Sequence, residues 1–265
     1  MPKKVFEQPD VDSNTVAELS KKLLESNLEL QRSENERRKI FENISHDLRA
    51  PLTAIRSTID LLMETERDEK SANLLKILDK RAQNLEELVQ NLYYLTKLEN
   101  GSEKLVFEEL PVSFFLEEYF FAAEIDERYA DRKLSIEVPE YLDVMVLADS
   151  NKITRVLDNL FTNAWKYSGS GAEIILGAYS DEEYVSIYVK DSGVGIPKEA
   201  IPHVFDRTFR VSKARTPSEN SGSGLGLSIV KSIILQHGGS VACESSIGEG
   251  STFTIKLPLI KKKEQ

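Results

Sequence analysis

The sequence predicts an α+β protein, in which a helical hairpin dimerises to a four-helix bundle and is followed by an α/β sandwich domain. Leucines recur at helical spacing through the first hundred residues. After Gly101 the pattern changes to short β-rich stretches, and helical segments lie between them. The 265 residues are enough for two modest domains, each with its own core.

Composition narrows the classes of partner and compartment. The formal net charge of −10 argues against a nucleic-acid partner, since phosphate backbones bind basic surfaces. The single cysteine, Cys243, cannot form an internal disulfide, which fits a reducing cytosol. No apolar run approaches the ~20 residues that span a bilayer, and the first residues lack a signal peptide. We therefore expect a cytoplasmic chain without membrane contact of its own, although a longer parent could be membrane-anchored.

The first hundred residues divide into three parts. Residues 1–14 are polar and are expected to be disordered. Residues 15–38 have the spacing of a two-stranded coiled coil, although three core positions are polar and a surface helix is the alternative. Residues 39–100 are expected to form a hairpin of two helices joined by a loop at 64–70. The apolar stripe of its first helix consists of Ile44, Leu48, Leu52, Ile55, Ile59 and Leu62, and that of the second of Leu74, Leu78, Leu85, Leu88, Leu92 and Leu95. One hairpin cannot bury both stripes, which predicts a homodimer.

Residues 104–260 are expected to form the α/β domain. Strands are predicted at 104–109, 133–138, 144–148, 172–179, 184–190, 240–246 and 251–257. Helices are predicted at 112–130, 150–167 and 224–237, covering one face of a mixed sheet. The long polar stretch 197–221 is expected to be a functional loop, which we interpret as a lid over a nucleotide.

Three motifs in this domain are typical of a binding site for a nucleoside triphosphate. Gly222-Ser-Gly-Leu-Gly-Leu-Ser opens a helix, and glycines there let the backbone approach an anion beside unpaired N–H groups. Asp191-Ser-Gly-Val-Gly-Ile-Pro offers a carboxylate, and Asn159-Leu-Phe-Thr-Asn163 offers two amides on one helix face. One glycine loop is weak evidence, but the three motifs together predict an ATP site.

With the upstream motif Phe41-Glu-Asn-Ile-Ser-His46-Asp47-Leu-Arg-Ala-Pro51, these segments resemble the catalytic half of a sensor histidine kinase of two-component signalling. The resemblance covers roughly residues 36–258 and implies an ATP-binding domain of the Bergerat, or GHKL, type. His46 lies roughly opposite the apolar stripe of its helix, so its imidazole is presented to solvent. The resemblance makes His46 the phosphoacceptor and Asp47 the group that orients it and accepts its proton.

The same resemblance assigns the nucleotide site. Asp191 would accept a hydrogen bond from the adenine amine, Asn163 would bind Mg²⁺, and Arg210 on the lid would contact the γ-phosphate. The other residues expected to contact nucleotide are Asn159, Lys166, Tyr167, Gly193, Gly195, Gly222, Gly224, Leu225 and Gly226. His203 and His237 are expected to be a lid-surface and a helix-end histidine without chemistry.

These roles predict an ATP- and Mg²⁺-dependent protein-histidine kinase that passes its phosphoryl group to an aspartate of a cognate response regulator. An upstream sensory domain or protein would supply the signal. One alternative is an ATPase or protein kinase of the gyrase, chaperone or mitochondrial carboxylate-dehydrogenase kinase kind. Those ATPases place a general-base glutamate where this chain has Asn159, which cannot take a proton. The other alternative is a dimeric scaffold that only accepts phosphoryl groups.

Overall fold

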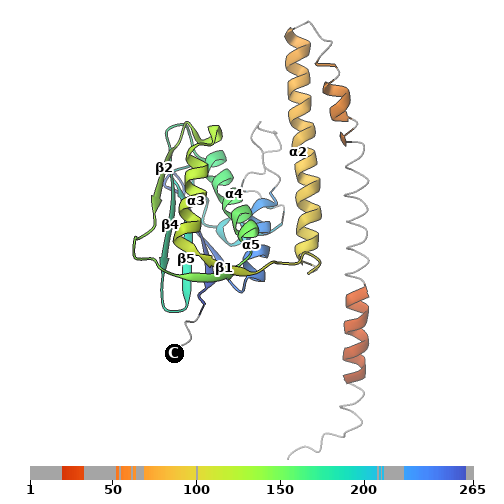
Figure 1. The fold of residues 1–265 in the computed structure, drawn as a ribbon. Coiled ribbons are helices and arrows are strands. Elements are labelled where there is room, and N and C mark those ends of the chain that lie inside the picture. The colour runs from red at the N-terminus through yellow and green to blue at the C-terminus, as the bar shows by residue number, and fades with distance from the viewer. Residues whose placement is uncertain are drawn as a thin grey trace, which may run out of the picture.

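The computed structural model confirms the predicted fold class, a helical part followed by an α/β domain with a mixed sheet (Figure 1). It describes residues 20–32, 52–53, 55–60, 62–63, 69–99, 101–207, 209, 211 and 224–260. Residues 20–32 are helical and exposed along their length. The segment 1–14, expected to be disordered, lies outside the described residues.

The hairpin is held by side chains spaced seven residues apart. Helix α2 spans Glu69–Glu99. Leu52 and Ile59 of the first helix form a small core, and their partners on α2 are Leu75, Ala82 and Val89. An ion pair between Arg56 Nη1 and Glu86 Oε2, 2.8 Å apart, joins the two helices at the edge of this core.

The predicted stripe of α2 does not face this small core. Leu74, Leu78 and Leu85 are exposed, and Leu95 packs in the core of the α/β domain. The prediction that Leu95 belongs to the bundle is therefore wrong, because the last turns of α2 dock on the second domain. The leucine spacing identified an apolar face without distinguishing between two possible partners for it.

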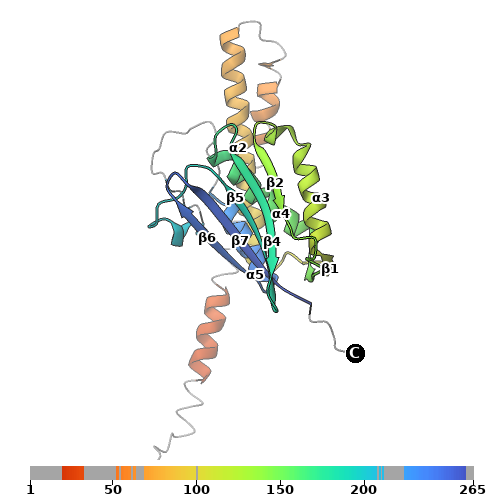
Figure 2. The ribbon, with the colours of Figure 1, turned by 90° about the vertical axis from the view of Figure 1, so that its left-hand side faces the viewer.

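In its described residues, the α/β domain contains two sheets and three longer helices. Its elements are β1 (Glu108–Pro111), α3 (Val112–Glu124), the 3-10 turn η1 (Glu127–Tyr129), β2 (Lys133–Glu137), β3 (Met145–Ala148), α4 (Ser150–Tyr167), β4 (Glu173–Ser180), β5 (Tyr184–Asp191), the 3-10 turn η2 (Ile201–His203), α5 (Gly226–Gln236), β6 (Ser240–Ser246) and β7 (Gly250–Pro258). The larger sheet has the order β2-β4-β5-β7-β6, in which only the β2–β4 pair is parallel. Its strands lie in front of α4 and α5 in Figure 2.

Two predicted elements differ from the structure. The strand expected at 104–109 begins only at Glu108, because the N–H of Val106 donates to Asp149 Oδ2 (3.0 Å) rather than to a neighbouring strand. The helix expected at 112–130 ends at Glu124. A separate turn follows, whose N-terminus is capped by Asp126 through a hydrogen bond from Arg128 N (2.9 Å).

The end of α2 is fastened to α4 and α5. Leu98 is fully buried in the domain core, and its carbonyl accepts a hydrogen bond from the Gln236 side chain on α5. The guanidinium carbon of Arg155 on α4 lies 3.7 Å from the centre of the Tyr94 ring, and the same group donates to Asn91 Oδ1 (3.0 Å). Stacking of a guanidinium on an aromatic ring adds to the apolar contact.

His237, at the C-terminal end of α5, is a buried junction between three segments. Its Nε2 accepts the N–H of Asp149 (3.0 Å), so Nδ1 must carry the proton that bonds to the carbonyl of Ile233 (2.8 Å). Its ring also packs edge-on against Phe107. Burial lowers the pKa of His237 below its usual 6.5, although the Ile233 carbonyl and Asp149 oppose the shift. The imidazole is therefore held neutral.

This junction predicts a loss of stability in acid. A pKa that is lower in the folded chain than in the unfolded one contributes stability above about pH 6.5, which is lost as the pH falls through the folded value. We expect the melting temperature to fall by a few degrees between about pH 7.5 and about pH 5.5. Thermal denaturation should show a shallower pH dependence in His237→Gln. The exposed His203, which contacts Asp206 at 2.9 Å, provides the control His203→Gln, with the wild-type slope. Equal slopes in all three proteins would contradict this role of His237.

Within the described part of the chain, no helix combines the length and apolar character needed to span a membrane.

Candidate functional site

Helix α4 is the scaffold of the site. Its N-terminus is capped by Asp149, whose Oδ1 accepts the N–H of Lys152 (3.1 Å). At its C-terminus, Arg132 Nη2 donates to the carbonyls of Trp165 (3.1 Å) and Ser168 (2.9 Å), groups that the helix itself leaves unpaired. The core face of the helix consists of Ile153, Val156, Leu157, Leu160, Phe161 and Ala164.

The predicted nucleotide contacts lie away from this core face. Asn159, Asn163 and Lys166 follow one another at spacings of four and three residues, so they share one side of α4. All three are half-buried, whereas Tyr167 is exposed. Asn159 Nδ2 donates to the carbonyl of Arg155 (2.8 Å). This bond turns Asn159 Oδ1 outward, toward α5.

Asp191 is a buried carboxylate at the end of the central strand β5. Only 4% of its surface is exposed, and its side chain accepts backbone hydrogen bonds from Gly193 (2.8 Å) and Ser251. Burial raises the pKa of this carboxyl above its usual value, and the two N–H donors oppose the shift. The carboxylate has four lone-pair positions, so these two donors leave capacity for a ligand donor.

The loop after Asp191 passes too close to its neighbours for side chains. A Cβ at Gly193 would lie 2.3 Å from the carbonyl oxygen of Tyr167 at the end of α4. A Cβ at Gly195, whose φ is +70°, would lie 1.9 Å from the carbonyl oxygen of Ser246. The loop is also bonded to α4, since Val194 N donates to the Tyr167 carbonyl (3.1 Å). Glycine is therefore required where the loop joins α4 and the β6–β7 turn.

The N-terminus of α5 meets α4 at Asn159. Gly224 has a φ of +71°, Leu225 is buried and Gly226 begins the helix. A Cβ at Gly226 would lie 2.7 Å from Asn159 Oδ1. The structure thus places the Asp191 loop and the Gly224–Gly226 turn against the same helix. Unpaired N–H groups at a helix N-terminus suit a phosphate.

Comparison with known families agrees with this arrangement. The family model described as "Histidine kinase-, DNA gyrase B-, and HSP90-like ATPase" matches residues 148–261. The model described as "His Kinase A (phospho-acceptor) domain" matches residues 36–101. The chain belongs to the sensor histidine kinases.

Two relatives illustrate the membership. The sensor histidine kinase WalK of Bacillus subtilis (strain 168) is 35% identical over 243 residues, which are 89% of this chain and 39% of that protein. The sensor protein kinase WalK of Staphylococcus haemolyticus (strain JCSC1435) is 34% identical over 234 residues, 87% of this chain and 38% of that protein. This chain therefore spans about two fifths of the length of the curated relatives it matches.

Solved histidine kinases share the fold. Full-length ShkA in complex with AMPPNP matches with a TM-score of 0.68 and 22% identity, over 84% of this chain and 46% of that one. The Acinetobacter baumannii histidine kinase AdeS matches with a TM-score of 0.55 and 23% identity, over 81% of this chain and 98% of that one. At these identities the matches show the fold alone.

Four predicted site residues of this histidine kinase lie outside the described residues: His46, Asp47, Arg210 and Gly222. Of the predicted lid, 197–207, 209 and 211 are described, and they include the turn η2. The structure brings Asp191 and Gly193 next to Tyr167, at the C-terminal end of α4. It brings Gly226 next to Asn159 on the same helix.

Three supporting residues were not foreseen. Asp149 and Arg132 hold the two ends of α4. Ser245 Oγ, on β6, accepts the N–H of Ile196 (2.8 Å) and donates to the carbonyl of Gly250 (2.7 Å). It thereby fixes the loop after Asp191 to the β6–β7 turn. Asp149 stands directly before a helix, where a cap was recognisable in the sequence. Arg132 and Ser245 gave no local signal.

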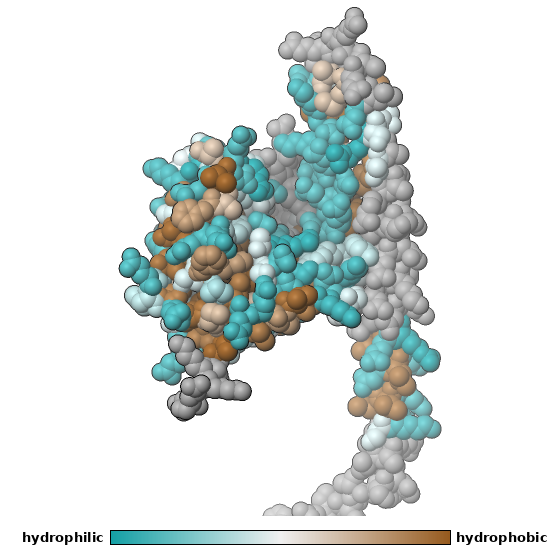
Figure 3. All heavy atoms as spheres, in the orientation of Figure 1, coloured by the Kyte–Doolittle hydropathy of each residue, from teal (hydrophilic) through white to brown (hydrophobic). Residues whose placement is uncertain are grey.

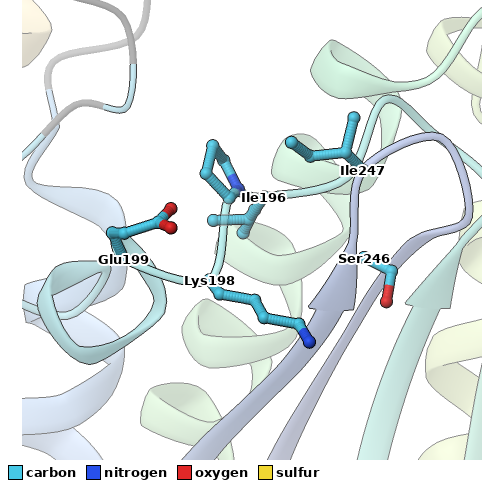
Figure 4. A pocket seen from close by; sticks show the side chains of 6 residues that line it. Ile196, Lys198, Glu199, Ser246 and Ile247 are labelled. Atoms are coloured by element: carbon cyan, nitrogen blue, oxygen red, sulfur yellow. The ribbon is translucent and has the colours of Figure 1, made fainter.

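An open pocket of about 290 Å³ lies beside the glycine loop (Figure 4). It is lined by Ile196, Pro197, Lys198, Glu199, Ser246 and Ile247. In the close-up, Ile247 stands on the β6–β7 turn opposite the segment that carries Ile196. The lining includes neither Asp191 nor the asparagines of α4, so we assign the pocket no part in the nucleotide site.

The close approach of Gly226 to Asn159 gives a direct test. In Gly226→Ala the new methyl group displaces the Asn159 amide, because the two groups cannot share the space. We expect phosphoryl transfer to fall about 10- to 100-fold, with the melting temperature unchanged, since alanine favours a helix.

A double-mutant cycle separates displacement from simple loss of glycine. If Gly226→Ala acts by moving Asn159, it adds little to Asn159→Ala. Gly169→Ala is the matched control, because nothing lies within 4 Å of a Cβ there. Fully additive losses in the double variant would refute this mechanism.

Proposed function

We propose that this chain is the catalytic part of a sensor histidine kinase that binds Mg·ATP, phosphorylates His46 and passes the phosphoryl group to an aspartate of a response regulator. Residues 15–38 would be the signalling coil, 39–100 the dimerisation and phosphotransfer domain, and 104–260 the ATP-binding domain. The observation that carries the proposal is that one helix, α4, receives the loop of the buried Asp191 at its C-terminal end and the α5 N-terminus at Asn159.

The buried carboxylate of Asp191 would make the site selective for adenine. Asp191 would accept a hydrogen bond from the adenine amine beside its two backbone donors. Guanine carries a carbonyl oxygen at that edge, which would leave the carboxylate facing another acceptor. An unpaired buried charge is costly, so this one contact discriminates strongly between the bases. Gly193 and Gly195 would let the backbone lie close to the ring.

The phosphates would lie between α4 and the N-terminus of α5. Gly224, Leu225 and Gly226 would line the phosphates at this helix N-terminus, and Gly222 and Arg210 would complete the cradle. Lys166 and Tyr167, at the end of α4, would contact phosphate oxygens or the ribose.

The donor set suits Mg²⁺ rather than a metal held by protein alone. Asn163 offers an amide oxygen on the half-buried side of α4 that it shares with Asn159 and Lys166, and no group of three His, Cys, Asp or Glu capable of holding a metal occurs among the described residues. Mg²⁺ keeps several waters and shares phosphate oxygens, so one protein ligand is sufficient. When bound, the ion would neutralise charge on the β- and γ-phosphates.

The transfer itself needs a neutral nucleophile. One imidazole nitrogen of His46 would attack the γ-phosphorus, forming an N–P bond as the bond to the ADP oxygen breaks. The proton on the other nitrogen would pass to Asp47, which also orients the ring. Arg210 would bind the γ-phosphate as charge develops in the transfer.

Exposed apolar residues on the hairpin support a homodimer. Within the described part of the hairpin these are Ile55, Leu62, Leu74, Ile77, Leu78 and Leu85. A stripe of this size is unfavourable in water, and a second hairpin would cover it as a four-helix bundle. The response regulator would dock on this bundle below His46. Input from an upstream sensory domain would shift helix packing and so the reach of the ATP domain.

Incubation with γ-labelled ATP and Mg²⁺ tests the proposal. We expect protein-bound label that is lost in acid, survives alkali and moves to a receiver domain when one is added. Release of labelled phosphate without labelled protein would instead indicate an ATPase of the gyrase or chaperone class. Neither product would indicate a scaffold. Acid-stable label would identify a hydroxyl as the acceptor and refute the assignment to histidine.

A further inference from the structure

Helix α3 has two apolar faces, of which the domain core uses only one. Its inner face consists of Val112, Leu116, Phe120 and Ala123, all buried. At 100° per residue, Phe114, Phe121 and Ile125 lie on the opposite side. They are 58%, 64% and 86% exposed. Large apolar side chains gathered on one face of a helix are normally covered by a partner, and the exposed fractions show that the described residues do not cover this face.

The outer face of α3, defined by these three residues, is an apolar stripe along one side of the helix. Figure 3 shows brown and tan patches on the side of the domain that carries α3 in Figure 1. With about 200 Å² for a fully exposed side chain of this size, the stripe presents roughly 400 Å² of apolar surface. Monomeric proteins seldom leave more than a few hundred Å² exposed without a function. Helix α2 does not use it, since α2 docks on α5.

Acidic residues border the stripe on both sides. Glu117 and Glu124 lie along one edge and Glu118 along the other, and all three are exposed. Helix α3 contains no lysine or arginine. The nearest arginine in sequence, Arg128, is paired with Asp126 (2.6 Å) and does not neutralise them.

This charge pattern selects among possible occupants. A second copy of the same face would bring glutamates against glutamates, which is unfavourable in an apolar contact. Anionic lipid headgroups and nucleic acid are repelled for the same reason. A protein surface with an apolar centre and lysine or arginine edges is complementary.

We propose that the outer face of α3 docks a partner protein through a basic amphipathic helix. From Phe114 to Ile125 the stripe is about 16 Å long, which matches three turns of a partner helix with apolar residues at every third or fourth position. Its area is at the low end for specific complexes, so the contact is transient. This surface is separate from the nucleotide site and does not depend on the proposed kinase reaction.

The probe is a fluorescent 18-residue helical peptide with a leucine stripe and lysine edges, and its counterpart carries glutamate edges. Anisotropy titrations use the full chain. We expect a Kd of about 10–100 μM for the lysine peptide and at least tenfold weaker binding in Phe121→Ser. The pair Glu117→Lys and Glu124→Lys should reverse the preference between the peptides. Tyr179→Ser, which changes an aromatic of similar exposure on β4, is the control and should bind as wild type does.

Three results would overturn the proposal. The first is that the wild-type chain binds the lysine and glutamate peptides with equal affinity, or that Phe121→Ser binds the lysine peptide as tightly as wild type does. The second is a change in sedimentation with Phe121→Ser, which would assign the face to self-association. The third is binding to phosphatidylserine vesicles that Phe121→Ser abolishes. Phe114→Ser replaces Phe121→Ser if that variant melts early. Labelling by ATP should be unchanged in all variants, which separates this test from the kinase proposal.

Discussion

Replacing His46 by glutamine is expected to abolish the acid-labile label, a loss of at least about 1000-fold. Glutamine is neutral and polar like imidazole, but its amide nitrogen is not a nucleophile. ATP binding should be unaffected, because the described residues assigned to the nucleotide lie on α4, at the end of β5 and in the loop after it, and at the N-terminus of α5. Labelling with γ-labelled ATP and titration with a fluorescent ATP analogue measure the two properties separately.

The other two histidines are matched controls for this substitution. His203 is exposed and contacts Asp206, whereas His237 is buried and holds the linker to α4. His203→Gln should label as wild type does, and His237→Gln should keep the acid-labile label at a pH where it is folded. Label that persists in His46→Gln would show that the acceptor is wrongly assigned.

Mixed dimers then show which protomer is phosphorylated. A dimer of one His46→Gln chain and one Asn163→Ala chain has one intact acceptor and one intact ATP domain. Labelling of the mixed dimer means transfer between protomers, and its absence favours transfer within one. We expect the handedness of the hairpin loop at 64–70 to set this choice, which sequence pattern does not determine.

Local patterns made the central elements of the fold predictable. The bounds of α4, 150–167, were predicted because apolar residues recur at helical spacing within them. The strand before α3 was misplaced because residues 104–107 look β-prone, yet Val106 bonds to a side chain 43 residues away. Leu95 was assigned to the wrong core for a similar reason, since its partners belong to another domain.

Some residues of the candidate site were likewise predictable from local motifs, and others were not. Its glycines and Asp191 stand in short motifs, so their type and spacing could be interpreted without a structure. Arg132 contacts carbonyls 33 and 36 residues away, and His237 contacts Asp149 over 88 residues. Neither residue has a local pattern that predicts such a partner. Motifs therefore identified the chemistry, whereas the groups that hold it in place required the fold.

Replacing Asp191 by asparagine is expected to weaken ATP binding at least about 100-fold and to remove labelling to the same degree. The asparagine oxygen can still accept the N–H of Gly193, so the loop keeps its bond. Its amide, however, presents donors to the adenine amine. Isothermal titration with ATP and GTP measures the loss of affinity and of preference for adenine.

Asp181 provides a control with the same local chemistry. Its Oδ1 accepts the backbone N–H groups of Glu183 (2.9 Å) and Tyr184 (2.7 Å) in the β4–β5 turn. Asp181→Asn therefore changes a turn carboxylate of the same sheet away from the nucleotide loop, and ATP binding should not change. Wild-type affinity in Asp191→Asn, or an equal loss in both variants, would contradict the role of Asp191.

Stability without nucleotide distinguishes binding from folding. The pKa of Asp191 is higher in the folded chain than in the unfolded one, so its contribution to stability is lost as the pH rises through the folded value. At about pH 7.5 the buried charge therefore lowers the stability of the folded chain, and asparagine removes that charge. We expect Asp191→Asn alone to melt no lower than wild type, whereas ATP raises the melting temperature of wild type only. A carboxylate that lowers stability yet is needed to bind ligand is what a functional site, rather than a structural one, requires.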